Sequence, residues 1–206
     1  MALQCAATLL VARHGDAEYP HAHVMSDDGG WLTDLGASQV QALAAKVAPQ
    51  RVAKVWSSPL GRAVQSGRLA AGVLDVGDEV LSGLEEIRVG ECVGRPFGDP
   101  SFQDVYDRWV AGDLDVRVPG AESGREVLER FREALQLIAD QHRGETVVVF
   151  THGGVMSFVI PRLSGNVSND LAAERFLPNA VPARIEIGDD GWRVLDWPGT
   201  ADRAVV

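Results

Sequence analysis

The sequence is poor in cysteine and in positive charge, and it has no long apolar run. Two cysteines, Cys5 and Cys92, are too few for a disulfide framework and lack the spacing of a zinc site, so a reducing cytoplasm is the expected location. The net charge is −10, with 19 basic and 29 acidic residues, which argues against a nucleic acid or an anionic membrane as partner. No segment approaches the roughly 20 apolar residues that are needed to span a bilayer. The triplet Leu3-Gln4-Cys5 is similar to a lipoprotein cleavage site, but no basic segment precedes it, and we expect no signal peptide.

What the chain does have is an alternation of strand and helix patterns. A length of 206 residues with 46% hydrophobic residues is most simply one globular domain, residues 1–206. The alternation predicts an α/β fold in three layers: a mostly parallel central sheet, helices on both faces, and a small cap-like insertion at about 88–120 over the C-terminal ends of the strands. We expect strands at 8–12, 52–56 and 146–150, a C-terminal edge hairpin of 183–187 and 192–195, a short amphipathic stretch at 102–109, and helices at about 33–48, 58–74, 123–142 and 155–163.

Local signals indicate where some helices begin and end. Thr33 is a typical N-cap, and Ser58 followed by Pro59 predicts an N-cap and a first helical residue. Pro161 is expected to break the last helix.

Two histidines stand where predicted buried strands end. His14 follows Arg13 at the end of the first strand, and His152 precedes a glycine pair at the end of another. Open parallel sheets build their sites at the carboxyl ends of strands, so both imidazoles are expected to lie close together. A lone histidine is usually a satisfied core or loop residue, but this pair favours phosphoryl transfer through a histidine nucleophile.

Four motifs, in order along nearly the whole chain, carry a resemblance to a known family. They are Arg13-His14-Gly15, Ser57-Ser58-Pro59-Leu60-Gly61-Arg62-Ala63-Val64-Gln65-Ser66, Leu84-Glu85-Glu86-Ile87 and Thr151-His152-Gly153-Gly154. One three-residue match is weak, whereas four in order at suitable spacing are specific. On these motifs the chain resembles the histidine phosphatase superfamily, whose fold is phosphoglycerate-mutase-like. The resemblance implies a phosphatase of the histidine acid type that needs no metal and no other cofactor.

The resemblance assigns the covalent intermediate to His14. The attacking nitrogen must then be neutral, while an acceptor such as a backbone carbonyl holds the other ring nitrogen. Arg13 offers planar donors to phosphoryl oxygens, and Gly15 completes this motif at the phosphate site. Because charge spreads over three equatorial oxygens in phosphoryl transfer, catalysis depends mainly on positioning and on cationic donors.

Three further residues complete the implied phosphate site. Arg62 falls in the first turn of the second helix, where its guanidinium and the free helix N–H groups can address the same anion. His152 is implied to be a protonated donor to the phosphoryl group. Gly153 allows the backbone to approach closely.

Glu86 and its neighbour Glu85 are the candidates for the proton donor. The leaving alkoxide needs a proton and the attacking water must later lose one, and a single carboxyl group can do both. The family pattern places the acid two residues after a leucine, which is Glu86 counted from Leu84. Glu85 would then point elsewhere as a solvated charge, and it stays open as the alternative acid.

The chain departs from the family pattern at three places. Family members often have an asparagine six residues after the nucleophile, and Pro20 at this position has no amide donor, which leaves open what makes that contact. Residues 90–94 keep only the glycines of the usual Gly-x-Trp-Glu-Gly, so the wall of the pocket should differ. Ala121 replaces a glycine of the family's Gly-Gly-Glu-Ser segment, although Glu122 and Ser123 can still cap the long helix and support the site.

His21 and His23 lie in the loop after the nucleophile. Two histidines at this spacing can ligate a metal from an extended chain, but a solvent-facing loop is the more common arrangement, and we expect no metal. Substrate selection at the rim of the site is the more natural use of these side chains.

The sequence therefore predicts a cytoplasmic phosphomonoesterase that acts through phospho-His14 on a small phosphorylated metabolite. A phosphoglycerate-type mutase, a catalytically weak binding module of the same fold, and a metallohydrolase using His21 and His23 are the alternatives. Only 66 positions separate Glu86 from His152, and mutases of the family have more sequence inserted there to form a closing lid. The physiological substrate and the oligomeric state, a homodimer included, stay open.

Overall fold

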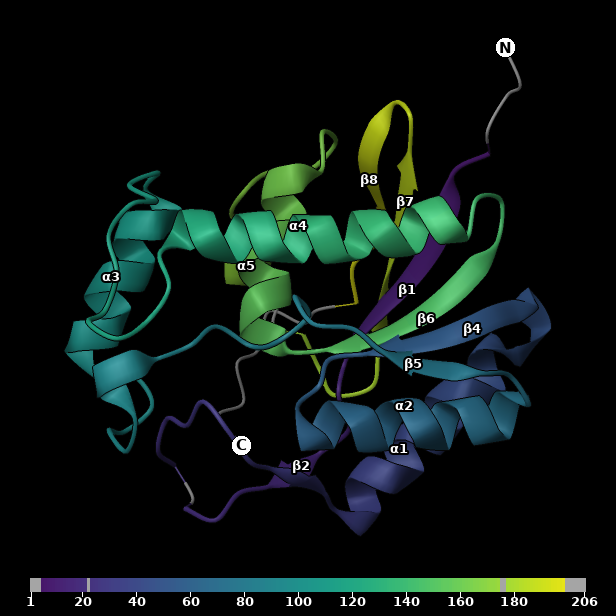
Figure 1. Ribbon diagram of the computed structural model, residues 1–206, viewed down its shortest axis with the longest axis horizontal. Coiled ribbons are helices and arrows are strands. Elements are labelled where there is room, and N and C mark those ends of the chain that lie inside the picture. The colour runs from purple at the N-terminus through teal and green to yellow at the C-terminus, as the bar shows by residue number, and fades with distance from the viewer. Residues whose placement is uncertain (1–4, 22, 175–176, 199–206) are drawn as a thin grey trace.

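A computed structural model describes residues 5–21, 23–174 and 177–198, which fold around one six-stranded sheet (Figure 1). The strand order is β5-β4-β6-β1-β7-β8. Four neighbouring strands run parallel, and the last two form an antiparallel hairpin at one edge. The strands are β1 (Ala7–Arg13), β4 (Val52–Ser57), β5 (Asp78–Val80), β6 (Thr146–Thr151), β7 (Pro182–Gly188) and β8 (Gly191–Asp196), and a separate ribbon pairs β2 (Ala17–Glu18) with β3 (Trp31–Leu32).

Two helices, α1 (Asp34–Val47) and α2 (Gly61–Leu74), cover one face of the sheet. Leu10 and Ala12 of β1 share a buried cluster with apolar residues of both helices. Thr33 caps α1 as predicted, because its side chain accepts a hydrogen bond from the third residue of that helix.

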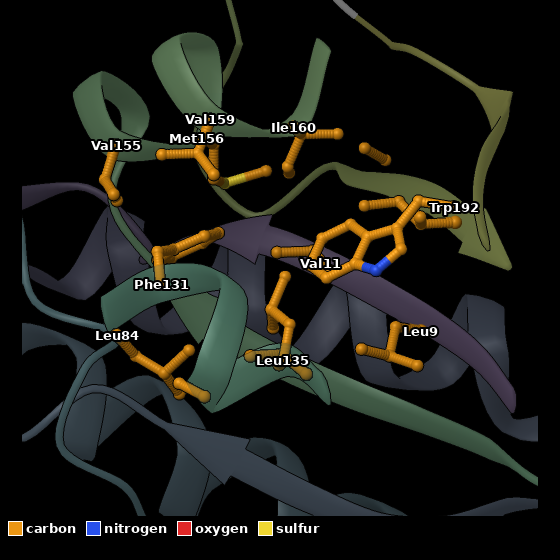
Figure 2. Close-up of a cluster of buried hydrophobic side chains, with 14 of the residues drawn as sticks. Leu9, Val11, Leu84, Phe131, Leu135, Val155, Met156, Val159, Ile160 and Trp192 are labelled. Atoms are coloured by element: carbon orange, nitrogen blue, oxygen red, sulfur yellow. The ribbon is translucent and has the colours of Figure 1, made fainter. Parts of the chain in front are cut away.

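Two other helices, α4 (Gly124–Gln141) and α5 (Gly153–Leu163), cover the opposite face (Figure 1). Leu9 and Val11 alternate with Leu10 and Ala12 along β1. They therefore point to this face and join a larger buried cluster. Figure 2 shows both residues below the labelled side chains of α5, with Val11 nearer to Phe131 of α4 than Leu9 is. Helices on both faces of a mostly parallel sheet confirm the predicted three-layer α/β fold.

One helix, α3 (Pro100–Val110), lies outside these layers, beside the N-terminal end of α4 (Figure 1). Trp109 packs against Gly124 so closely that a Cβ on this glycine would lie 2.8 Å from the indole ring. Asp99 caps the first turn of α3. This helix belongs to the segment predicted as an insertion at about 88–120. The remaining short elements are the 3₁₀ turns η1 (Ala48–Gln50) and η2 (Gly90–Cys92) and the single turn α6 (Leu171–Glu174).

Two local predictions are wrong. Ser58 does not cap α2, whose N-cap is Leu60, because the chain continues in extended form past β4 and the Ser58 N–H donates to the carbonyl of Phe150. Pro161 does not break α5, since a proline in the last turn of a helix removes only one hydrogen bond. The sequence also does not predict β5, whose residues are all exposed.

Of the triplet Leu3-Gln4-Cys5, only Cys5 lies within the described residues, so the expectation about a signal peptide is untested. None of the helices within residues 5–21, 23–174 and 177–198 is both long and apolar enough to cross a membrane.

Candidate active site

The C-terminal ends of β1 and β6 bring the two predicted histidines together. Arg13 is aligned with Thr151 in the parallel pairing of these strands, so the residue that follows each of them lies at the same level. The ring centroids of His14 and His152 are 5.4 Å apart. Both imidazoles are buried, with 3% and 0% of their surface exposed. The expectation that the two imidazoles would lie close together is therefore confirmed.

His14 is a neutral imidazole whose Nε2 is unprotonated and accepts a hydrogen bond. Its Nδ1 lies 2.7 Å from the carbonyl oxygen of Gly15, and because a carbonyl only accepts, Nδ1 carries the proton. The Nε–H of Arg62 donates to His14 Nε2 at 3.1 Å. Burial lowers the pKa of His14 to about 3, and the charges of Arg62 and Arg13 add to this shift. His14 thus has the protonation state that its predicted role as nucleophile requires, with the predicted backbone acceptor.

Gly15 is required where the chain leaves β1. A Cβ at this position would lie 2.5 Å from the backbone oxygen of Gly36, so α1 leaves no room for a side chain. The N–H of Gly15 donates to the buried Ser66 hydroxyl at 3.1 Å, and that hydroxyl donates to the carbonyl of Arg62 at 2.8 Å. Ser66 therefore links the loop after His14 to the helix that carries Arg62.

Arg62 and Arg13 supply the positive charge of the site. Arg62 is the second residue of α2, is 4% exposed, and donates to the carbonyl of Gly29 at 2.6 Å. The ring of Tyr19 lies 5.4 Å from its guanidinium carbon. Burial lowers the pKa of Arg13, although an arginine in a protein keeps its charge. Gly153 lets Arg13 pack closely, because a Cβ there would be 3.3 Å from Arg13 Cδ.

His152 is also uncharged in this environment. Burial lowers its pKa well below the usual value, and neighbouring charges, that of Arg62 first, oppose a further positive charge. Its Nε2 is hydrogen-bonded to the Ser58 hydroxyl at 2.8 Å, while Nδ1 is buried and has no hydrogen-bond partner among the described residues. This state differs from the protonated donor that the resemblance implies, because the ring is buried and the charged groups around it are cationic. A dianionic phosphoryl group beside it would favour the protonated form.

Glu86 points into the N-terminus of α5, whereas Glu85 points away from it. Glu86 accepts from the N–H of Gly154 at 2.9 Å and from the N–H of Val155 at 2.7 Å. Glu85 accepts from the N–H of Gly83 at 2.6 Å. The directions of the two side chains favour Glu86 as the acid. The description of Glu85 as a solvated charge is wrong, because this half-buried carboxylate is bonded within its own turn.

Three residues around the histidines are not singled out by the sequence. Ser66 and Ser58 lie within the second motif. Serine is common near the start of a helix, so its presence there does not indicate a contact with the histidines. Asn179 comes from a distant segment, and its Nδ2 donates to the carbonyl of His14 at 2.9 Å. No local pattern marks this asparagine.

His21 and His23 are not part of the histidine cluster. His21 lines a small cavity of about 90 Å³ together with Tyr19 and Pro20, and His23 adopts a positive φ of 64°. No group of three histidine, cysteine or acidic residues in the described parts of the chain is arranged to hold a metal ion. The rim role of these two histidines stays a prediction, as does the residue that makes the contact missing at Pro20.

A buried neutral imidazole lies beside a guanidinium at the strand ends of an α/β sheet, an arrangement suited to binding an anion. Comparison with known sequences then gives the family. The chain belongs to the histidine phosphatase superfamily (branch 1), whose sequence model matches residues 9–200. The resemblance based on four motifs is confirmed.

Individual relatives span most of the chain. It is 29% identical over 199 residues to phosphoglycerate mutase-like protein 4 of Arabidopsis thaliana, which covers 93% of this chain and 84% of the relative. It is 27% identical over 200 residues to the metal-independent phosphoserine phosphatase of the same plant, covering 92% and 80%. The solved structure of Bacillus stearothermophilus YhfR has a TM-score of 0.79 at 23% identity, over 95% of this chain and 98% of that one, which shows the same fold.

Proposed function

We propose that the protein is a phosphomonoester hydrolase that forms a phosphohistidine at His14 and acts on a small phosphorylated metabolite. The observation that carries this proposal is the state of His14, whose Nδ1 proton is bonded to the Gly15 carbonyl and whose unprotonated Nε2 accepts only from Arg62, a cation that can turn to a phosphoryl oxygen. A binding module has no need of such a nucleophile. The family supports the phosphatase class but not the narrower label of histidine acid type, which the proposal does not include.

In the first step, the Nε2 lone pair of His14 attacks phosphorus. The N–P bond forms as the bond to the leaving oxygen breaks, and protonated Glu86 gives its proton to that oxygen. Arg62 turns its Nε–H from Nε2 to a phosphoryl oxygen, and Arg13 donates to another. Both cations stabilise the charge that spreads over the equatorial oxygens.

In the second step, water attacks the phosphohistidine. Glu86, now a carboxylate, takes the proton of the water as the new P–O bond forms. The N–P bond breaks, its electron pair returns to Nε2 of His14, and inorganic phosphate leaves. No metal is needed, because the arginines and His152 provide the donors.

The names of the two plant relatives point to two outcomes, hydrolysis and mutase activity. Both use the same intermediate and differ in what accepts the phosphoryl group. The short stretch between Glu86 and His152 favours hydrolysis, because little sequence is left to form a lid that excludes water. A cytoplasmic location and a small phosphorylated substrate are parts of this proposal.

Trapping the intermediate tests the proposal. Wild-type protein mixed with a ³²P-labelled phosphomonoester and quenched rapidly in alkaline detergent should carry label that survives base and is lost in acid. His14→Ala should carry no label and lose essentially all turnover. The matched control, His23→Ala, changes an exposed loop histidine and should still form the label. Turnover by His14→Ala at about a tenth of the wild-type rate or more would show that another residue is the nucleophile.

A further inference from the structure

All five N–H groups of Arg130 in α4 donate hydrogen bonds to the segment that carries Glu86 or to Glu122. One terminal nitrogen donates to the carbonyls of Gly83 and Glu85, at 3.0 and 2.9 Å. The other donates to the carbonyl of Glu86 at 3.1 Å and to a carboxylate oxygen of Glu122 at 2.6 Å. The Nε–H donates to the second oxygen of Glu122 at 2.8 Å. The guanidinium is therefore fully satisfied in one fixed orientation.

The segment needs such partners because residues 84–89 form neither helix nor strand. Backbone carbonyls in an irregular segment must find hydrogen-bond donors outside a sheet or helix ladder. The carbonyl of Leu84, between those that Arg130 binds, accepts from the buried Thr151 hydroxyl at 2.6 Å. Farther along, the N–H of Arg88 donates to Glu122 at 3.2 Å. Four consecutive carbonyls, 83 to 86, are thus held by two side chains.

Glu122 sets the direction of the guanidinium. The two side chains form a bidentate pair and are 21% and 13% exposed, so water competes little for these hydrogen bonds. A lysine at position 130 has three donors on a point charge and cannot reproduce a planar fork that reaches two partners on opposite sides. This arrangement requires arginine.

These contacts place the backbone of Glu86, while its carboxylate is bonded on the other side to the start of α5. We infer that Arg130, oriented by Glu122, is a positioning residue for the general acid Glu86. The inference rests on the proposed function, because it assumes that Glu86 donates the proton. Small displacements of a catalytic group cost rate even when the group itself is intact.

Leaving-group dependence separates positioning from simple structural support. Arg130→Lys should lower kcat/KM for an alkyl phosphate such as glycerol 2-phosphate by about 10- to 100-fold, part of the 10²–10⁴-fold that a general acid contributes. For p-nitrophenyl phosphate, whose leaving group needs little protonation, the loss should stay below about threefold. Glu122→Gln keeps the shape of the side chain and should also lower kcat/KM more for the alkyl phosphate than for p-nitrophenyl phosphate. This second variant tests the inference if Arg130→Lys folds poorly. The matched control is Arg125→Lys in the same helix, where the arginine pairs with Asp115 at the surface.

A double-mutant cycle completes the test. In a Glu86→Gln background there is no acid to position, so Arg130→Lys should have little further effect on the alkyl phosphate. Equal losses on both substrates, or full additivity with Glu86→Gln, would overturn the positioning role and leave the proposed function standing. If Glu86→Gln itself shows no leaving-group dependence, the acid assignment fails, and this inference fails with it.

Discussion

The carboxylate of Glu86 occupies the space that a side chain at position 154 would fill, since a Cβ on Gly154 would lie 2.7 Å from Glu86 Oε1. The same carboxylate accepts from two N–H groups in the first turn of α5, the helix for which His152 is the N-cap. The candidate acid and the second histidine are therefore joined through one helix N-terminus. The second glycine of the Gly153-Gly154 pair is explained by the approach of the carboxylate.

Glu86→Gln should slow alkyl phosphates far more than aryl phosphates, because glutamine cannot protonate the leaving oxygen. General acid catalysis contributes about 10²–10⁴-fold, so the contrast is readily measured as kcat/KM on the two substrate types. Glu85→Gln tests the alternative acid and should change the ratio of the two rates far less than Glu86→Gln does, although the Glu85 carboxylate lies 4.0 Å from Arg130. A larger effect from Glu85→Gln would move the acid to that residue.

The free energy of unfolding should fall as the pH drops below about 6.5, and His14→Gln should reduce this dependence. Burial lowers the pKa of His14 from 6.5 to about 3 in the folded protein, so between these values only the unfolded chain binds a proton at this site. Stability therefore rises with pH in this range, by up to about 1.4 kcal/mol per pH unit for each such histidine. His152, whose pKa burial also lowers, acts in the same direction. Urea unfolding at pH 7 and pH 5 measures the difference, and an unchanged pH dependence in His14→Gln would contradict the low pKa of His14.

Removal of metal ions should leave turnover unchanged, because the proposed chemistry uses arginine and histidine donors. Saturating EDTA is the test, and vanadate should inhibit as an analogue of the pentacoordinate phosphorus. The double variant His21→Ala/His23→Ala should retain phosphohistidine formation, with any change confined to substrate selection. The metallohydrolase alternative would be supported if EDTA abolished activity, a divalent cation restored it, and the double variant were itself inactive.

Hydrolysis should exceed mutase activity. The protein incubated with 3-phosphoglycerate and a bisphosphoglycerate primer should release inorganic phosphate, because the short stretch between Glu86 and His152 leaves little sequence for a lid that excludes water. The measurement compares free phosphate with 2-phosphoglycerate over time. Rapid formation of 2-phosphoglycerate with little free phosphate would identify a mutase.

Local patterns in the sequence predict the layers of the fold and the two histidines at strand ends. Periodic apolar residues predict the strands that end at His14 and His152 and the long helix α4, and Ser123 caps that helix with the reciprocal bonds to Glu126 of a capping box. Such signals act over a few residues, so they can be recognised along the chain. The parallel sheet then places both strand ends at one edge, which is why the positions of the two histidines could be predicted.

How these groups are held and charged depends instead on contacts between residues far apart in the sequence. Asn179 reaches the carbonyl of His14 across 165 positions, and Arg130 reaches that of Glu86 across 44, and neither partner has a local signature. The same holds for the neutral state of His152, because a pKa set by burial and by nearby cations depends on packing that brings distant residues together. Ser58 shows the limit most directly. A serine before a proline is typical of a helix N-cap. In the structure, Ser58 lies outside α2 and its hydroxyl is hydrogen-bonded to His152.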